Sequence, residues 1–236
     1  MVPARLTAFG EVIRALNPDT HTIPYKIDKW HDHLDDHPDL IRLSCRFQHR
    51  LSRGDLGLLS REAHADPEGL IALFIATMIW GFGNTNYGPW RTRLMLNDLE
   101  RQRGTGPNAL VQALRRLREG DLSAAYHGFA VERCGPPFMA KFFYACGLGM
   151  DREPPPLILD SVVAKSLWVL ALDSELDVTL YVKGVDASGK GSVTWYPDGY
   201  VRYVRLMHDW AQALGCRADA VEMFLFDPPA EFLAGG

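Results

Sequence analysis

Residues 136–168 read PPFMAKFFYACGLGMDREPPPLILDSVVAKSLW and contain two strongly apolar segments with a proline run between them. Pro136 and Pro137 are typical of the first turn of a helix, where the N–H that proline lacks would be unpaired anyway. The first segment ends at Gly147-Leu148-Gly149, and the second begins after Asp160, whose carboxylate can cap a helix N-terminus. The stretch therefore predicts two apolar helices.

Helical periodicity continues on both sides of this pair. Further helices are predicted over residues 4–16, 25–36, 38–53, 69–80, 88–101, 107–119, 198–214 and 217–226. Residues 178–196 differ, because Val178, Leu180 and Val182 alternate with other side chains at the period of a β-strand, and "GVDASGKG" supplies a turn. We therefore expect an all-α, two-lobed fold with one small β-hairpin near 178–196.

The sequence contains no internal repeat and no low-complexity linker. We expect residues 1–236 to form a single compact helical unit, with one lobe at 66–150 and the other formed by 1–65 and 151–236. This arrangement is typical of a chain of this length, which is long enough for a sizeable core.

Composition excludes several classes of protein. The four cysteines are too scattered for a disulfide framework, a zinc ribbon or an iron–sulfur run. No apolar run is long enough to span a bilayer and no secretion signal is visible, so we expect a cytoplasmic protein that does not act at a membrane. The formal net charge is −4, so any contact with nucleic acid must come from a local patch.

The stretch "WHDHLDDH" (residues 30–37) has the composition of a metal site. Its spacing is one residue too long for the H-x-H-x-D-H motif, and no third ligand is identifiable elsewhere. A solvated helix face that mixes acids and imidazoles explains the pattern better. We expect no metal, and a metal-dependent hydrolase that uses His31, His33 and His37 remains an alternative.

Lys141 is the first candidate for chemistry, because it lies near the start of a predicted helix among Phe138, Phe142 and Phe143. Burial and the positive end of the helix dipole both favour a neutral amine. A neutral lysine is a nucleophile that can form a Schiff base. The alternative is a lysine whose stem packs on the apolar face while its amine reaches water.

Asp160 is the second candidate for chemistry. The alternative is that its carboxylate only caps a helix. The helix that carries Lys141 rises only about 9–12 Å from that residue to its end, at about 1.5 Å per residue. The eleven residues 150–160 can span up to about 35 Å, which is enough for the chain to return to the level of Lys141. The two side chains can therefore face one cleft.

The segments "AKFFYACG" and "LILDSVVAKSLW" resemble the lysine helix and the aspartate helix of the helix-hairpin-helix DNA glycosylases. The nineteen-residue spacing of Lys141 and Asp160 is similar to that of the 8-oxoguanine DNA glycosylase branch. The turn Asn84-Thr85-Asn86 looks like the asparagine-rich turn that this branch inserts into DNA in place of the extruded base. The resemblance implies a DNA glycosylase in which Lys141 attacks the sugar and Asp160 stabilises the positive charge that develops on it.

One departure from the family concerns the hairpin, which is usually glycine-rich and here reads "CGPPFMAK". Proline has no N–H to donate to a phosphate, so side chains must hold the DNA backbone. The segment from Asn84 to Arg118 contains seven arginines and two acidic residues, which gives a local charge of 7 − 2 = +5. We expect Arg91 and Arg93 to contact phosphates; the alternative is a pair of helices with solvated arginine faces.

The sequence leaves two candidates for the base that is removed. The resemblance indicates 8-oxoguanine, whereas the altered hairpin suggests a specialised bacterial relative that acts on hypermodified phage cytosine, such as glucosylated 5-hydroxymethylcytosine, in anti-phage defence. Trp80, Trp195 and Phe224 are candidates for the base pocket, although buried aromatic side chains are more often core.

We expect a monomer that binds double-stranded DNA with a modified base and needs no cofactor. It should leave an abasic site, with or without strand cleavage by a lyase step. The alternative of a different class is a non-catalytic DNA-binding module, against which the presence of both Lys141 and Asp160 argues.

Overall fold

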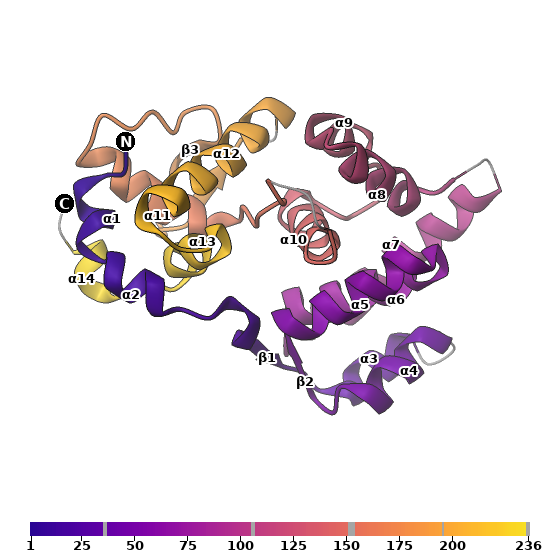
Figure 1. The fold of residues 1–236 in the computed structure, drawn as a ribbon. Helices are drawn as coiled ribbons and strands as arrows, with labels where there is room; N and C mark the ends of the chain where they lie inside the picture. The colour runs from indigo at the N-terminus through magenta and orange to yellow at the C-terminus, as the bar shows by residue number, and fades with distance from the viewer. Residues whose placement is uncertain (35–36, 105–106, 151–153, 195, 235–236) are drawn as a thin grey trace. The chain divides into compact units, whose positions relative to one another are not determined.

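The computed structural model describes residues 1–34, 37–104, 107–150, 154–194 and 196–234. The chain divides by its internal contacts into a central unit, Asp19–Pro155, and a terminal unit, Met1–Pro18 with Pro156–Gly236. Helices dominate both units, and the sheets seen in the described ranges are two-stranded and antiparallel (Figure 1). The all-α class expected from the sequence is confirmed.

The central unit is built around α6 (Leu70–Phe82), which is apolar on all sides and almost completely buried. A helix of this kind must be surrounded by others, and α4, α5, α7 and α10 pack against it. The other elements of the unit are β1 (Thr22–Pro24), α3 (Ile27–Leu34), α4 (Pro38–Arg46), β2 (Arg50–Ser52), α5 (Arg53–Ala65), η2 (Pro67–Gly69), α7 (Tyr87–Arg103), α8 (Ala109–Glu119), α9 (Leu122–Gly128) and α10 (Pro136–Gly147).

The terminal unit joins the two ends of the chain. It contains α1 (Ala4–Ala8), α2 (Gly10–Ala15), α11 (Ser161–Leu172), β3 (Val182–Val185), β4 (Gly191–Val193), α12 (Pro197–Leu214), α13 (Ala218–Phe226) and α14 (Ala230–Leu233), while η1 (Pro18–Thr20) lies at the boundary. α13 packs against α2, α11 and α12. Arg14 Nη1 donates to the Leu214 carbonyl at 2.8 Å and so ties the first helices to the last ones.

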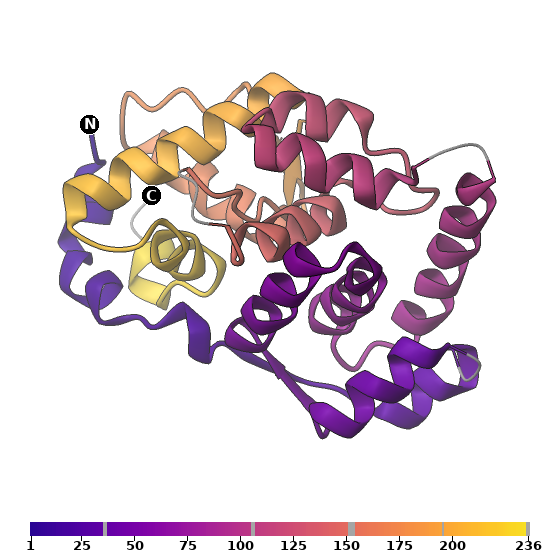
Figure 2. The same cartoon turned by 45° about the vertical axis from the view of Figure 1, so that its right-hand side comes forward.

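The helix predicted over 38–53 is wrong in its second half. α4 ends at Arg46, His49 takes a left-handed φ of 62°, and β2 pairs antiparallel with β1. The α3–α4 pair is thus inserted between two paired strands (Figure 2). Helical period reports only neighbours along the chain, so it could not show a strand whose partner precedes it by two helices.

Other boundaries also differ from the expectation. The helix predicted over 4–16 is interrupted at Phe9 and becomes α1 and α2. α5 and α9 were not predicted, although α5 has a capping box between Ser52 and Asp55 that the sequence displays. None of the helices in the described ranges combines the length and the apolar character that a bilayer crossing requires.

The hairpin expected near 178–196 is confirmed, with Val182 opposite Val193 and Val185 opposite Gly191. Its first strand begins later than predicted. The Val178 carbonyl accepts hydrogen bonds from the N–H groups of Tyr181 and Val182, so residues 178–181 form a turn. The apparent alternation there reflects a turn that buries Tyr181 and exposes Leu180.

Residues 19–65 belong to the central unit together with residues 66–150, whereas the sequence pattern predicts a lobe that joins residues 1–65 with 151–236. Strand β2 and helix α5 make this connection, since both pack against α6. Hydrophobic patterning showed that these helices have buried faces but not which neighbour each face meets.

Candidate active site

Lys141 lies in the second turn of α10 and is only 8% exposed. Its stem passes close to Gly81 on α6, where an added Cβ would lie 3.1 Å from Lys141 Cδ. Its Nζ lies 5.8 Å from the centroid of the Phe138 ring. Lys141 therefore lies in a largely buried setting beside an aromatic ring.

An aromatic stack connects this lysine to the asparagine turn. Phe138 stacks on Phe82 with ring centroids 4.0 Å apart. Gly88 allows the start of α7 to lie close to Phe82, because a Cβ at position 88 would lie 2.5 Å from Phe82 Cβ. The intervening residues Asn84, Thr85 and Asn86 are all exposed. The turn thus projects from the same part of the central unit that holds Lys141.

Beside this turn lie four side chains that we name the aromatic–arginine patch: Tyr87, Trp90, Arg91 and Arg133. Tyr87 is 50% exposed and Trp90 40% exposed. The Arg91 guanidinium lies 5.6 Å from the Tyr87 ring centroid, and that of Arg133 lies 5.5 Å from the Trp90 ring centroid. Arg91 Nε also donates to the Arg133 carbonyl at 2.7 Å, which fixes the turn before α10.

Three members of this patch were not identified from the sequence. Tyr87 and Trp90 follow the asparagine turn at helical spacing, and this signal could have found them. Arg133 could not have been found in this way, because its left-handed φ of 64° and its contact with Trp90 depend on the fold.

The other predicted DNA contact, Arg93, lies on a different face of α7 from Arg91, as two residues of a helix must. Its Nη1 donates to the His33 carbonyl on α3 at 3.4 Å. Several of the remaining arginines are engaged locally: Arg101 with Asp98 and Glu132, Arg116 with Glu119, and Arg118 with His64. Part of the positive charge in this run is therefore already engaged within the protein.

Asp160 is the N-cap of α11 and is 8% exposed. Its Oδ1 accepts hydrogen bonds from the backbone N–H groups of Val162 and Val163 at 3.0 and 3.2 Å. Two buried tyrosines of α12 hold the segment that leads to it. Tyr200 donates to the Leu157 carbonyl at 2.7 Å and Tyr203 to the Ile158 carbonyl at 2.6 Å.

Lys141 belongs to the central unit and Asp160 to the terminal unit, and each position is defined within its own unit. The predicted settings, an aromatic helix for the lysine and a helix cap for the aspartate, are both present. Their convergence on one cleft stays a prediction.

Two of the three residues predicted to form a base pocket, Trp80 and Phe224, have the contacts of core side chains. Trp80 is 6% exposed; its Nε1 donates to the His21 carbonyl at 3.4 Å, and the buried Arg53 guanidinium lies 5.3 Å from its ring. Phe224 is 2% exposed and packs against Phe9 and Phe232 in the terminal unit. Trp195 lies outside the described residues.

The histidine stretch is divided between two helices, with His31 and His33 on α3 and His37 before α4. In the described ranges, no group of three or more histidine, cysteine or acidic side chains is placed to hold a metal ion.

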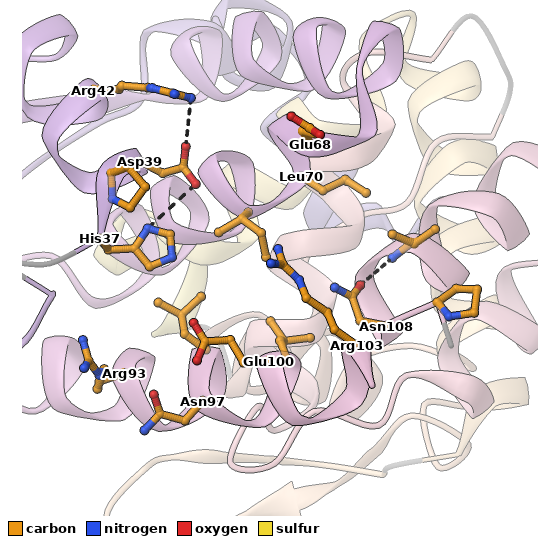
Figure 3. A pocket seen from close by; sticks show the side chains of 16 residues that line it. His37, Asp39, Arg42, Glu68, Leu70, Arg93, Asn97, Glu100, Arg103 and Asn108 are labelled. Atoms are coloured by element: carbon orange, nitrogen blue, oxygen red, sulfur yellow. Dashed lines mark hydrogen bonds and ion pairs between the residues drawn. The ribbon is translucent and has the colours of Figure 1, made fainter. Parts of the chain in front are cut away.

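His37 instead lines a cavity of about 780 Å³ between α4, α7, α8 and the start of α6 (Figure 3). Basic side chains such as Arg42 and Arg103 alternate there with acids such as Asp39 and Glu100. Leu70 lines this cavity, whereas Lys141 meets Gly81 at the other end of α6, about 16 Å away at 1.5 Å per residue. The cavity is therefore separate from the lysine.

Two cysteines lie near α10, and neither competes with Lys141 as a nucleophile. Burial raises the pKa of the Cys134 thiol to about 12, although the Arg91 guanidinium acts in the opposite direction. Burial also raises the pKa of Cys146, which lies inside α10. Both thiols are therefore protonated at neutral pH and react slowly.

These features define an all-helical protein with a candidate Schiff-base lysine beside an exposed asparagine turn. Residues 16–226 match the family described as "Putative 8-oxoguanine DNA glycosylase OGG-like protein", and the chain belongs to that family. The match spans the whole central unit and most of the terminal unit, so the family is one of DNA glycosylase type with DNA as its substrate. No curated protein and no solved structure matches the chain.

Proposed function

We propose that this protein is a DNA glycosylase that extrudes a modified base from double-stranded DNA and breaks its glycosidic bond. The observation that carries the proposal is the buried Lys141, packed on Gly81 and Phe138 next to an exposed asparagine turn, in a chain that belongs to an OGG-like family. A base inside a duplex is out of reach of such a group, so the target nucleotide must first leave the stack.

In the proposed mechanism, the lone pair of Lys141 Nζ attacks C1′ of the extruded nucleotide. The bond from C1′ to the base breaks, and the base departs with the bonding electron pair and takes up a proton. The ionised Asp160 carboxylate stabilises the positive charge that develops on the sugar. Two backbone N–H groups donate to this carboxylate and hold it in place.

The sugar then remains bound to Lys141 as a Schiff base after the nitrogen loses a proton and the ring opens. Hydrolysis by water restores the amine and leaves an abasic site. In the lyase alternative, loss of a proton from C2′ expels the 3′ phosphate and cleaves the strand before hydrolysis.

On the DNA side, we propose that the Asn84–Asn86 turn fills the space of the extruded base. The aromatic–arginine patch then lies beside it, with exposed rings for stacking and guanidinium groups for phosphates. This surface takes the place of the backbone N–H groups that prolines 136 and 137 cannot offer.

Two bases are proposed as substrates, 8-oxoguanine and a hypermodified cytosine such as glucosylated 5-hydroxymethylcytosine of phage DNA. The first follows from the family description, and the second from the proline-containing segment "CGPPFMAK" in place of a glycine-rich hairpin.

The proposal is tested by incubating the protein with duplexes that carry each modified base, or only ordinary bases, and identifying the released base by mass spectrometry. Asp160→Asn should lower the rate of base release by about 10²–10³-fold, as loss of an electrostatic stabiliser does. Lys141→Gln should abolish release, because the attacking amine is gone. Both variants should keep their circular dichroism spectrum and DNA affinity. Release from none of the duplexes, or full activity in either variant, would contradict the proposal.

A further inference from the structure

The β3–β4 hairpin is the part of the terminal unit that the proposed chemistry leaves without a role. It carries Lys183 and Lys190, and Lys165 lies beside it on α11. The chain has only six lysines and a net charge of −4, so half of its lysines gather around this one small element.

The hairpin is fastened to the first turn of α11. A Cβ at Gly191 would lie 2.3 Å from the Ser161 carbonyl oxygen and 2.5 Å from the Lys165 nitrogen. Only glycine can occupy that position, because any other residue would collide with the helix backbone. Since Asp160 caps this same helix, the hairpin is anchored directly next to the proposed catalytic carboxylate.

The lysines share the outward side of the hairpin. Val182 and Val193 are buried toward the unit, whereas Lys183, Lys190 and Ser192 are exposed, as the alternation of a β-strand requires. Lys165 joins them from the helix, because its Nζ would lie only 3.7 Å from a Cβ at Gly189 in the hairpin turn.

One acid lies near these amines, and it interacts electrostatically with Lys190. Asp186 is the acid of the turn, and its Oδ1 accepts from the Ser188 and Lys190 backbone N–H groups at 2.9 and 3.0 Å. Within the described ranges, no carboxylate forms an ion pair with Lys165, Lys183 or Lys190. Three ammonium groups and one nearby carboxylate leave a surplus of positive charge on this surface, which is suited to a polyanion.

We propose that Lys165, Lys183 and Lys190 form a second DNA-contact surface, which holds backbone phosphates of the strand that presents its sugar to Asp160. This inference rests on the proposed function, because it uses the position of Asp160 relative to the hairpin. The contact is to phosphates, so it should act on any DNA sequence and on modified and unmodified duplexes alike.

The test is the salt dependence of binding to an unmodified duplex by wild-type protein and by the double variant Lys183→Glu, Lys190→Glu. Loss of two phosphate contacts should reduce the slope of log affinity against log salt by about 1.8. The loss of affinity should then be about tenfold larger at 50 mM than at 200 mM salt, by the same slope. The matched control Lys183→Arg, Lys190→Arg keeps both charges and should keep wild-type affinity and slope.

An unchanged slope in the glutamate variant, with its circular dichroism spectrum intact, would overturn the inference. So would a loss of affinity that occurs only with one modified base, because that would indicate recognition of the base rather than of phosphates. If the wild-type protein releases no base but the glutamate variant still shows the smaller slope, the proposed function fails while the contact surface stands. If base release is normal and the slope is unchanged, only the contact surface fails.

Discussion

Gly81 sets how closely α6 approaches the proposed nucleophile. Added Cβ contacts of 3.1 Å to both Lys141 Cδ and Phe138 Cε1 mean that even a methyl group would press on two side chains of the site. The lysine stem is flexible, but Phe138 is held in place by its stack on Phe82. A side chain added at position 81 would therefore displace the stem of Lys141 rather than the Phe138 ring.

We predict that Gly81→Val displaces the Lys141 amine and slows base release while DNA affinity stays unchanged. A side chain forced off its rotamer costs about 1 kcal/mol, which corresponds to about a fivefold lower rate. Single-turnover kinetics measure the rate. The matched control is Gly128→Ala at the end of α9, where an added Cβ meets nothing within 4 Å. A wild-type rate in Gly81→Val would show that the contact does not position Lys141.

Arg91 and Arg93 offer a matched pair of charges in the same turn of α7. Arg91 belongs to the exposed patch beside the asparagine turn, whereas Arg93 donates to the His33 carbonyl. We predict that Arg91→Glu weakens binding to all duplexes and reduces the salt slope by about one, because one phosphate contact is lost. Arg93→Glu should leave the slope almost unchanged. Equal effects of the two variants, measured by fluorescence anisotropy, would contradict the assignment of the patch.

At the scale of elements, α12 determines the position of Asp160. Its tyrosines hold the carbonyl groups of Leu157 and Ile158, the residues that lead into the cap of α11. Tyr203 is completely buried, so its hydroxyl has no water to bond if the partner shifts.

We predict that Tyr203→Phe lowers the free energy of unfolding by about 1–2 kcal/mol, because the Ile158 carbonyl loses its buried donor. The rate of base release should fall as well, since the segment before Asp160 becomes less constrained. Urea denaturation and single-turnover kinetics measure the two effects. If stability falls without any change in rate, the tyrosine supports the fold and does not position the carboxylate.

The sequence predicts elements well where the signal is local. Pro136 and the glycines at 147 and 149 define both ends of α10, and Asp160 defines the start of α11, at nearly the observed bounds. Strand β2 was missed because its partner lies beyond two helices, and the contact between Arg133 and Trp90 was missed because a left-handed residue creates it. Local sequence patterns thus predict where helices begin and end, whereas the contacts between residues far apart in the sequence follow only from the fold.

At the scale of the whole molecule, charge is distributed unevenly. The segment 91–118 has an excess of positive charge. Arg101 and Arg116 nevertheless form ion pairs with acids, and Arg118 donates a hydrogen bond to the His64 carbonyl. The lysines around the hairpin and the arginines of the patch are local gatherings of positive charge in a protein with a net charge of −4, although Asp186 lies near Lys190 and Glu132 pairs with Arg133. In a chain of this charge, such local patches must supply the attraction to DNA.

Lys141 and Asp160 are proposed to act at separable steps of the reaction. In the proposed mechanism, Asp160 is needed to break the glycosidic bond, whereas Lys141 also reacts with the aldehyde of an abasic site that already lacks its base. Borohydride should therefore trap wild-type protein on both modified-base and abasic-site DNA. Asp160→Asn should be trapped on abasic-site DNA alone, and Lys141→Gln on neither. Denaturing gel electrophoresis measures the covalent complex. Trapping of Lys141→Gln on abasic-site DNA would assign the nucleophile to another amine, and equal trapping of Asp160→Asn on both DNAs would remove the carboxylate from the bond-breaking step.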